Sequence, residues 1–332
     1  GEPMKEKVLT ICVAAFNVEK YIKNTLESCC IDSIIDQIEV IVVNDGSTDN
    51  TVDIARKFEN KYPDTFRIID KENGGYGSVV MEGIKESRGI FFKLLDGDDW
   101  FDPDGITKLV DKLSVTRADA VISGFCKATD KELEICNNEL IKYDGMEVDA
   151  ESFDEVVGMW QLTARTSIFR QSDINLPHYC LYTDTLYVLF TLPYLTKIEV
   201  MASPVYCHYV GRSEQSISRE NRIKHADEAL KVFDAMFLNY MDIKKSGKPS
   251  LMVQDRMDKS YRNIIRTLLL FKCDRRVREK LIEYEGKVKS DAKEIFDIRK
   301  AKTVEKIMFF MLRKSNYYLY YLISFVGIPN WG

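Results

Sequence analysis

The sequence has no cysteines spaced as CxxC, and its eight cysteines are scattered along 332 residues. This usage is typical of proteins from a reducing cytosol and argues against a disulfide framework or a zinc site. No uncharged apolar run of about 18 residues occurs, so a spanning helix is not expected. The polar N-terminal residues GEPMKEKVLT do not resemble a signal peptide. We therefore expect a cytoplasmic protein.

An excess of positive charge is also missing. The chain has 47 Lys and Arg against 52 Asp and Glu, a formal net charge of −5, which argues against nucleic acid as the main partner. Hydrophobic residues make up 45% and charged residues 30% of the chain, as expected for a folded protein. The length allows one large domain or two ordinary ones, and no internal repeat is visible.

Apolar runs alternate with helical patterns through the first hundred residues. The strands are expected at 8–16, 38–45, 66–70 and 89–95, and the helices at 17–30, 47–62 and 77–87. Ser47, Thr48 and Asp49 are good N-caps for the second of these helices. Such alternation predicts an α/β fold, a mostly parallel central sheet with helices on both faces. From about residue 217 onward the pattern is helical and highly charged.

Polar stretches follow each of these strands, or nearly so: AAFN, NDGS, ENGG and DGDD. Ligands of parallel sheets bind beyond the carboxyl ends of the strands. We therefore expect all four stretches to converge on one crevice.

The last of these stretches places Asp96, Asp98 and Asp99 within four residues. Two carboxylates about 4 Å apart repel by roughly 4 kcal/mol at an effective dielectric constant near 20. A fold that gathers three of them supplies a cation, shares a proton or exposes them to water. Mg²⁺ or Mn²⁺ prefers such oxygen ligands, and Gly97 lets the backbone turn. The alternative is a solvated acidic turn or a cap for the helix that follows.

The residues at the ends of the first two predicted strands favour binding of a nucleotide base over binding of a dinucleotide. The stretch after strand one lacks the glycine fingerprint of nicotinamide enzymes. Phe16 could stack on a base face or be a core aromatic, while Ala14 leaves room for the ring. Asp45 could accept the imide N–H of uracil or bind a ribose hydroxyl, and it could also stabilise the turn before the next helix.

Several segments together resemble family 2 glycosyltransferases, which have the GT-A fold. They are VLTICVAAFNVEKYIKNTLES, IEVIVVNDGSTDNT and ENGGYGSVVMEGIKESRGIFFKLLDGDDWFDPD. The resemblance is strong over about residues 7–115 and weaker through LYTDTLYVLF and YCHYVGRSEQSIS. It implies a GT-A domain over 1–215, with a nucleotide-binding half at about 7–115 and an acceptor half at about 116–215. Residues 216–332 form a separate helical C-terminal region.

The resemblance also implies roles for single residues. Ala14, Phe16 and Asp45 match the base-contacting positions of the family, although Phe16 replaces a commoner Tyr. Asp96 and Asp98 match its Asp-x-Asp motif, in which one carboxylate reaches the ribose and the other the metal.

The resemblance bears on further positions. Asp99 is the usual extra acid and is expected to share either task, the ribose contact or the metal. Asp184 matches the catalytic base, with Thr183 in place of the usual Glu; the alternative for Asp184 is an N-cap for the helix that follows. Val80 and Met81 fall where the family often has Arg-Asn.

The motif YCHYVGRSEQS offers a closing loop, in which Arg212 would neutralise the diphosphate and His208 would contact the metal. An ordinary hydrogen-bonded strand histidine is the slightly favoured alternative for His208. Trp100 could stack on a sugar or pack the acidic loop.

The C-terminal stretch from Arg299 to Gly332 contains six Lys or Arg, one Glu and many aromatic residues. A basic helix of this composition suits the surface of an anionic membrane. The alternative is a helix packed on the enzyme or on a second subunit.

These observations lead to one leading prediction. The protein is a metal-dependent (Mn²⁺ or Mg²⁺), inverting glycosyltransferase of the hexosyltransferase class. It moves a sugar from a nucleotide-sugar, expected to be a UDP-sugar, to a glycan or lipid-linked acceptor in polysaccharide or glycolipid synthesis, in the cytoplasm or peripherally on the inner face of the membrane. The alternatives are a nucleotidyltransferase and a non-catalytic nucleotide-sugar-binding protein. The oligomeric state is left open.

Overall fold

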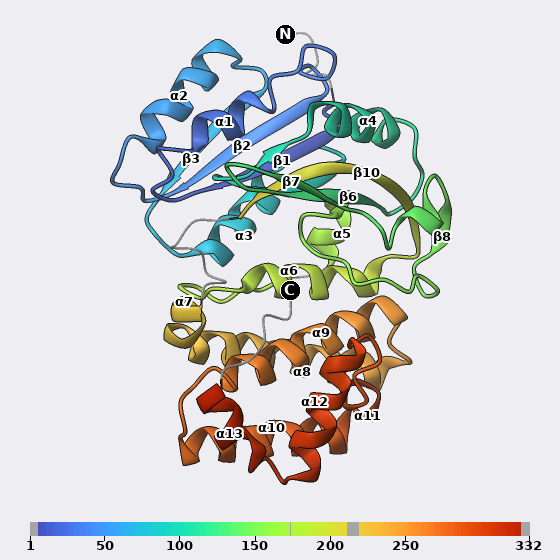
Figure 1. Ribbon diagram of the computed structural model, residues 1–332. Coiled ribbons are helices and arrows are strands. Elements are labelled where there is room, and N and C mark those ends of the chain that lie inside the picture. The colour runs from blue at the N-terminus through green and yellow to red at the C-terminus, as the bar shows by residue number, and fades with distance from the viewer. Residues whose placement is uncertain (1–5, 173, 211–218, 327–332) are drawn as a thin grey trace. The chain divides into compact units, whose positions relative to one another are not determined.

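One sheet organises the first of the two units into which the chain divides, residues 1–211 and 212–332. The computed structural model describes residues 6–172, 174–210 and 219–326 (Figure 1). Within the described residues the strands of the first unit join in the order β3-β2-β1-β4-β9-β6-β10-β5, with β7 paired to β6 and β8 to β10. In chain order the strands are β1 (Leu9–Ala15), β2 (Ile38–Asp45), β3 (Phe66–Lys71), β4 (Phe91–Asp96), β5 (Trp100–Phe101), β6 (Ala120–Ala128), β7 (Leu133–Cys136), β8 (Glu147–Asp149), β9 (Leu162–Arg165) and β10 (Lys197–Tyr209).

Strands β1 to β4 are all parallel, as the sequence predicts, and β10 is parallel to β6. Strands β5, β7, β8 and β9 pair antiparallel with their neighbours. The helical elements of this unit are α1 (Ile22–Glu27), α2 (Thr51–Lys61), α3 (Tyr76–Glu86), α4 (Pro103–Leu113), η1 (Ile141–Tyr143), α5 (Thr166–Gln171), α6 (Thr183–Thr191) and η2 (Leu192–Tyr194). Figure 1 shows α1, α2 and α4 on one face of the sheet and α3, α5 and α6 on the other. The predicted α/β architecture is confirmed.

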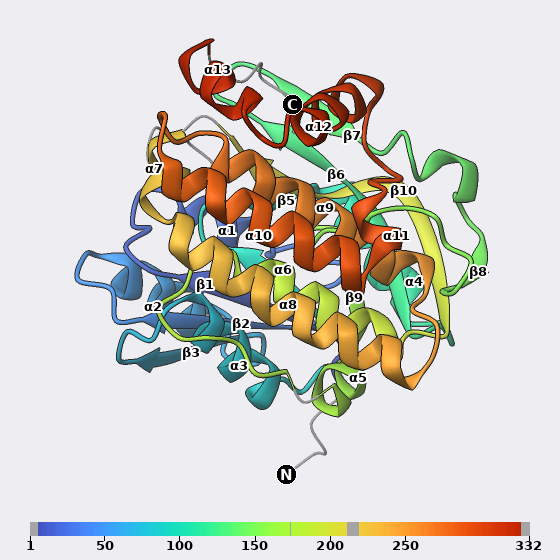
Figure 2. The same ribbon diagram turned by 90° about the horizontal axis from the view of Figure 1, so that it is seen from below.

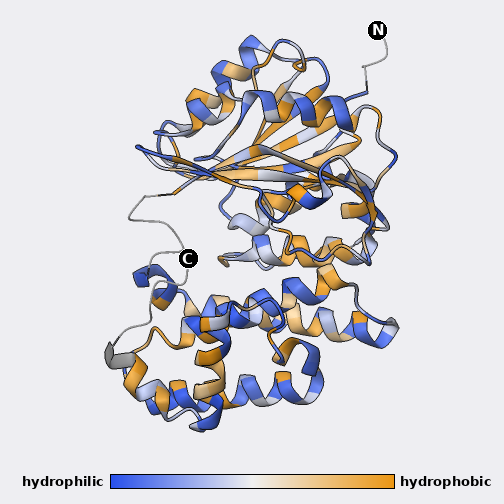
Figure 3. Ribbon diagram, turned by 45° about the vertical axis from the view of Figure 1, so that its right-hand side comes forward, coloured by the Kyte–Doolittle hydropathy of each residue, from blue (hydrophilic) through white to orange (hydrophobic). Residues whose placement is uncertain are grey.

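The apolar runs of the sequence become the core of this unit. Every residue of β2 is buried, and β1 and β4 each have one residue that is only partly covered. Figure 3 shows hydrophobic residues concentrated along the strands of the sheet. Helix α3 packs so closely on this core that a Cβ at Gly83 would lie 2.2 Å from the Cys12 sulfur.

The starts of two predicted helices are wrong, for one shared reason. The segment from residue 17 to 21 is not helical, and α1 begins at Ile22. Asn17 has φ +51°, and its backbone N–H donates to Ser47 Oγ at 3.0 Å. The backbone N–H of Glu19 donates to Asp49 Oδ2 at 3.0 Å. Ser47 and Asp49 therefore bind the loop after β1, although Asp49 also accepts the Thr51 backbone N–H at 3.0 Å, and the N-cap of α2 is Asn50.

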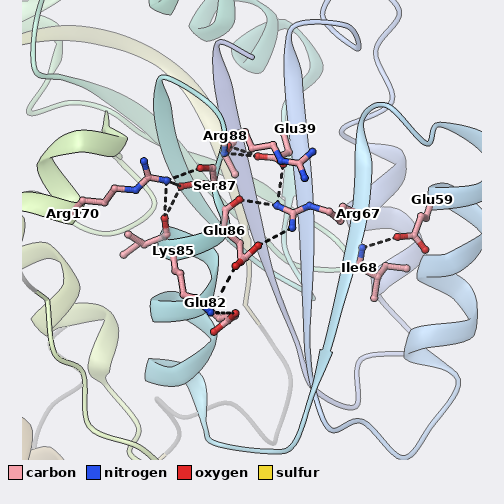
Figure 4. A network of polar contacts seen from close by, with 12 residues as sticks. Glu39, Glu59, Arg67, Ile68, Glu82, Lys85, Glu86, Ser87, Arg88 and Arg170 are labelled. Carbon is pink, nitrogen blue, oxygen red and sulfur yellow. Dashed lines mark hydrogen bonds and ion pairs between the residues drawn. The ribbon is translucent and has the colours of Figure 1, made fainter. Parts of the chain in front are cut away.

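At the amino ends of the strands, a network of buried and half-buried charges holds the sheet to its helices (Figure 4). Glu39 accepts a hydrogen bond from Thr10 at 2.8 Å and one from Arg67 at 3.2 Å. Arg67 also donates to Glu86 at the end of α3, at 3.1 Å. Arg170 of α5 donates to the Ser87 carbonyl at 2.7 Å. This edge is thus structural, and it leaves the carboxyl ends of the strands for a ligand.

Strand β10 has an irregularity that later matters for the site. Its register against β6 shifts between Met201 and Pro204 and again between Pro204 and Tyr206. Beyond the second shift the pairing is regular, with Tyr206 opposite Phe125 and Cys207 opposite Cys126.

The second unit is helical where it is described, as predicted for the C-terminal region. Its helices are α7 (Arg219–Lys224), α8 (Ala226–Ser246), α9 (Leu251–Leu268), α10 (Arg275–Asp291), α11 (Lys293–Phe296), α12 (Thr303–Lys314) and α13 (Leu319–Val326). Figure 2 shows α8, α9 and α10 side by side. None of the helices in the described part of the chain combines the length and the apolar character needed to cross a bilayer.

Buried charges hold these helices together. Arg262 of α9 contacts Asp258 at 2.8 Å and Glu305 of α12 at 2.9 Å. Glu285 of α10 accepts hydrogen bonds from Arg313 at 2.8 Å and from Tyr317 at 2.7 Å. Groups of this kind are costly to separate, because removing one partner leaves an uncompensated buried charge.

A fully buried lysine lies within the sheet. Lys93 of β4 has 0% exposure, and its ammonium group donates to the Trp160 carbonyl at 2.9 Å. Burial lowers the pKa of Lys93 to about 7 from its ordinary value of 10.5. Unfolding exposes the amine to water, so the unfolded chain binds one more proton than the native chain between these two values.

We predict that Lys93→Met changes the pH dependence of stability. In the native protein the unfolding free energy gains about 1.4 kcal/mol per pH unit from this lysine between the two pKa values. The variant lacks this gain, so its stability relative to the native protein falls as the pH rises through that window. Urea unfolding at a series of pH values measures the difference. Lys108→Met, at an exposed lysine of α4, is the matched control, and an equal slope in all three proteins would contradict the burial effect.

Candidate active site

Loops from the carboxyl ends of β1 to β4 meet at one edge of the sheet, as the sequence predicts. Gly97, after β4, donates its N–H to the Ala14 carbonyl at the end of β1 at 2.9 Å. A Cβ at Gly97 would lie 2.7 Å from that same carbonyl oxygen, so the close approach requires glycine. Thr25 of α1 donates to the Gly97 carbonyl at 2.9 Å and holds the turn from the other side.

Asp45, at the end of β2, is buried and organises the loop before α3. Its carboxylate accepts Lys71 Nζ at 2.7 Å and the backbone N–H groups of Gly74 and Gly75, each at 2.8 Å. Gly75 has φ +81°, and a Cβ there would lie 2.7 Å from the Tyr179 backbone nitrogen. These contacts give Asp45 a structural role. Its predicted contact with a base stays a prediction.

Phe16 lies on the loop after β1, next to Ala14 and Ala15 at the strand end. Its side chain is 49% exposed, so the alternative of a core aromatic is wrong. An exposed ring at the carboxyl edge of a parallel sheet can stack on a planar ligand. The predicted base contact of Ala14 and Phe16 is compatible with this placement and stays a prediction.

Asp99 is buried and held by several contacts from β10. It is 1% exposed. One carboxylate oxygen accepts the Tyr206 hydroxyl at 2.6 Å and lies 3.1 Å from His208 Nδ1. The other accepts the Tyr209 backbone N–H at 2.7 Å. In this structure Asp99 ties the acidic loop to β10, and these contacts do not support its predicted role as a metal ligand.

Asp96 ends β4 and is held by a tyrosine from α3. Tyr76 donates its hydroxyl to Asp96 Oδ1 at 2.8 Å. Burial, together with the charges of Asp99 and Asp98, raises the pKa of Asp96 well above its ordinary value of 3.8. The site therefore favours a neutral or cation-compensated Asp96.

His208 lies beside the acids on β10. Its ring stacks on Trp160, with ring centres 5.6 Å apart and planes at 17°. Burial alone would lower the pKa of His208, but the hydrogen bond with Asp99 and the nearby carboxylate charges outweigh it and raise the pKa above 6.5. Its Nδ1 atom lies 3.1 Å from an Asp99 carboxylate oxygen, so this nitrogen already has a partner. The contacts therefore favour a hydrogen-bonded strand histidine over the predicted metal ligand.

Asp184 occupies the first turn of α6, on the same face of the sheet as α3. The N-cap of α6 is Tyr182, with φ +66° and no side-chain capping bond, so the capping alternative for Asp184 is wrong. Burial and then the charges of Asp96 and Asp184 raise the pKa of Tyr76 well above 10.0. Asp184 is thus within electrostatic reach of the hydroxyl that holds Asp96. Its role as the base stays a prediction.

The residues present fit a divalent ion only with the help of a substrate. Across the described residues, no group of three or more His, Cys, Asp and Glu side chains is placed to hold a metal ion. Magnesium sites often use one or two carboxylates and complete the shell with water and substrate phosphates. Asp98 is half-buried on the loop after β4, and its role as a metal ligand stays a prediction.

Two further predicted residues have different outcomes. Arg212 lies outside the described residues. The Trp100 ring is half-buried and lies 6.1 Å from the Tyr209 ring, which agrees with the alternative that it packs the acidic loop.

Sequence reasoning missed the aromatic residues that support the acids. Tyr76, Tyr206 and Trp160 come from three different segments, and only the fold brings them to the acidic loop. Tyr76 follows the ENGG stretch directly, so its position beyond β3 could have indicated it. Nothing in the local pattern of β10 identifies Tyr206.

Comparison with known proteins decides the family. Residues 10–182, slightly more than half of the chain, match the family described as Glycosyl transferase family 2. The chain belongs to this family. This family 2 glycosyltransferase is 42% identical over 101 residues to EpsH of Bacillus subtilis (strain 168). That alignment spans 30% of this chain and 29% of EpsH, so the chain spans under a third of that relative.

Two solved structures share its fold. Residues 1–349 of TarS from S. aureus, in complex with UDP-GlcNAc, superpose with a TM-score of 0.57 at 19% identity, over 96% of this chain and 92% of that one. The mannosyltransferase PcManGT of Pyrobaculum calidifontis, in complex with GDP-Man and Mn²⁺, gives a TM-score of 0.53 at 14% identity, over 97% of this chain and 84% of that one. The predicted family and fold class of this chain are confirmed.

We predict that two buried tyrosines respond in opposite ways to loss of the hydroxyl. Tyr206→Phe removes the bond to Asp99 and should lower the free energy of unfolding by about 1–3 kcal/mol. The Tyr187 hydroxyl, equally buried, has no hydrogen-bond partner among the described residues, so Tyr187→Phe should leave stability unchanged or raise it. Urea unfolding of both variants tests this, and equal losses would show that the bond to Asp99 does not account for the effect of Tyr206→Phe.

Proposed function

We propose that this chain is a metal-dependent, inverting glycosyltransferase that takes a sugar from a UDP-sugar and transfers it to a hydroxyl of a glycan or lipid-linked acceptor. The observation that carries the proposal is the acidic loop at the carboxyl end of β4. There Asp96 and Asp98 lie beside the loop that carries the exposed Phe16. Asp184 is within electrostatic reach of the Tyr76 hydroxyl, which donates to Asp96.

The donor would bind along this edge of the sheet. Phe16 stacks on the base, and Asp96 reaches the ribose from a position fixed by Tyr76. A divalent ion held by Asp98 and the diphosphate would stabilise the negative charge of the departing nucleotide as a Lewis acid. UDP-GlcNAc in TarS and GDP-Man with Mn²⁺ in PcManGT support a nucleotide-sugar and a metal for a site on this fold.

Asp184 would act on the acceptor. A carboxylate on α6 takes the proton of the acceptor hydroxyl as that oxygen attacks the anomeric carbon. A single direct displacement of this kind inverts the anomeric configuration. Nothing in the described loop after β1 supplies the glycine- and cation-rich cradle of a nucleotidyltransferase, which makes that alternative weaker.

We predict that substitutions of Asp184 and Asp98 have different effects on nucleotide binding and on sugar transfer. With Mn²⁺ and a panel of UDP-sugars, Asp184→Asn should keep nucleotide binding in a thermal-shift assay and lose transfer by about 10²–10⁴-fold. Asp98→Ala should lose both the Mn²⁺-dependent shift and turnover, as EDTA does in the native protein. Asp111→Asn, at an exposed acid of α4, is the control. Native turnover in Asp184→Asn, or full activity in EDTA, would overturn the proposal, and binding without any turnover would indicate a sensor.

A surface on α12 supports a membrane-linked acceptor. We define the α12 surface by its exposed side chains: Lys302, Thr303, Val304, Lys306, Ile307, Phe310, Met311 and Lys314. It has three cations, four apolar residues and no exposed acid, because Glu305, the one acid of this helix, is buried against Arg262 and Arg266. We propose that this surface binds anionic lipid on the cytoplasmic face of the cell membrane.

We predict that replacing both Ile307 and Phe310 by Glu weakens binding to phosphatidylglycerol vesicles at least about tenfold in a flotation assay. Each change removes an apolar contact and adds a charge that anionic lipid repels. Leu238→Glu, at a residue of α8 that is 63% exposed, is the matched control and should bind like the native chain. Equal flotation of the double variant, or no flotation of the native chain, would rule out the α12 surface as a lipid site.

A further inference from the structure

Two cysteines face each other on the neighbouring strands β6 and β10. Cys126 of β6 and Cys207 of β10 are register partners in a parallel pair. Their sulfur atoms lie 2.6 Å apart, and each residue is 2% exposed. Both are free thiols in this structure.

The backbone at this position suits a disulfide bond. Neighbouring strands lie about 4.7–4.9 Å apart, and disulfides join Cα atoms about 4.4–6.8 Å apart. Register partners present their side chains on the same face of the sheet, so no strand has to move far to close the bond. A shared metal ion is a poorer explanation, since no group of three metal-binding side chains is found in the described parts of the chain.

The surroundings connect this pair to the site. Cys207 lies between Tyr206 and His208, and both of these neighbours contact Asp99. It also pairs with Trp100, which directly follows Asp99, across the antiparallel β5–β10 ladder. A change at Cys207 therefore acts on the strand that positions the acidic loop.

We propose that Cys126 and Cys207 are a site of reversible disulfide formation that links the oxidation state of the protein to the geometry of the acidic loop. A peroxide is the oxidant. The thiolate of one cysteine attacks one peroxide oxygen, which breaks the O–O bond, forms a sulfenic acid and releases hydroxide that is protonated to water. The thiol of the other cysteine then attacks the sulfenic sulfur, and its proton leaves with the sulfenic hydroxyl group as a second water. Two thiols and one hydrogen peroxide thus give one disulfide and two water molecules.

Either cysteine can be the first nucleophile, because either sulfur of the pair can be the hydrogen-bond donor. Thiolate, rather than thiol, is the species that attacks an oxidant. A dithiol reductant such as dithiothreitol reverses the bond by exchange.

The test uses the full chain with Cys273→Ser, which removes the exposed cysteine and leaves seven thiols. After mild hydrogen peroxide, titration of the denatured protein should find five thiols, and peptide mapping without reductant should find the segments containing Cys126 and Cys207 joined. When Cys126→Ser is added to this chain, peroxide should no longer remove two thiols. When Cys12→Ser is added instead, at a buried cysteine elsewhere in the sheet, peroxide should still remove two.

The link to the acidic loop has its own readout, which does not depend on turnover. Trp100 pairs with Cys207 and Trp160 stacks on His208, so oxidation should change tryptophan emission, and dithiothreitol should restore it. Retention of seven thiols, or a cross-link elsewhere in the peptide map, would overturn the disulfide. A disulfide without any change in emission would overturn its link to the loop. Because the map is made on the Cys273→Ser chain itself, the test stands even if the Cys126 variant fails to fold.

Discussion

Three carboxylates within four residues repel one another, and the structure around β4 is organised to contain that repulsion. Asp99 accepts hydrogen bonds from β10, and Asp96 accepts one from the Tyr76 hydroxyl of α3. Asp98, like Asp96, is half-buried. The fold thereby ties two of the three acids, Asp96 and Asp99, to neighbouring elements.

The nucleotide-binding half was largely predictable because its signals are local. Strands buried on both faces read as continuous apolar runs, and β2 was predicted with its observed bounds. The order of the polar stretches after those strands placed the acids, Phe16 and Asp45 at one edge of the sheet. The first helix was predicted too long because its apolar spacing continues into a loop. The competing signal was the row of polar side chains at residues 47–51, which bind that loop's backbone.

The residues that position the acids could not be predicted from the sequence in the same way. Tyr206 lies more than a hundred residues from Asp99, and its strand reaches the acidic loop only after the irregular register of β10. Burial of the ionic groups in the second unit was equally hidden, since Arg262, Glu285 and Glu305 look like surface charges in a helical sequence. Their burial depends on pairing between helices, which residue spacing within one helix does not reveal.

The irregular register of β10 constrains how such a chain can vary. After the second shift, alternate residues serve opposite faces of the sheet: Tyr206 and His208 reach Asp99, while Cys207 meets Cys126. Inserting or deleting one amino acid downstream of Pro204 would exchange the two sets, turning a hydroxyl and an imidazole away and bringing a sulfur into their place. Length changes in this strand are therefore tolerable only upstream, where the existing distortion can absorb them before the alternation begins.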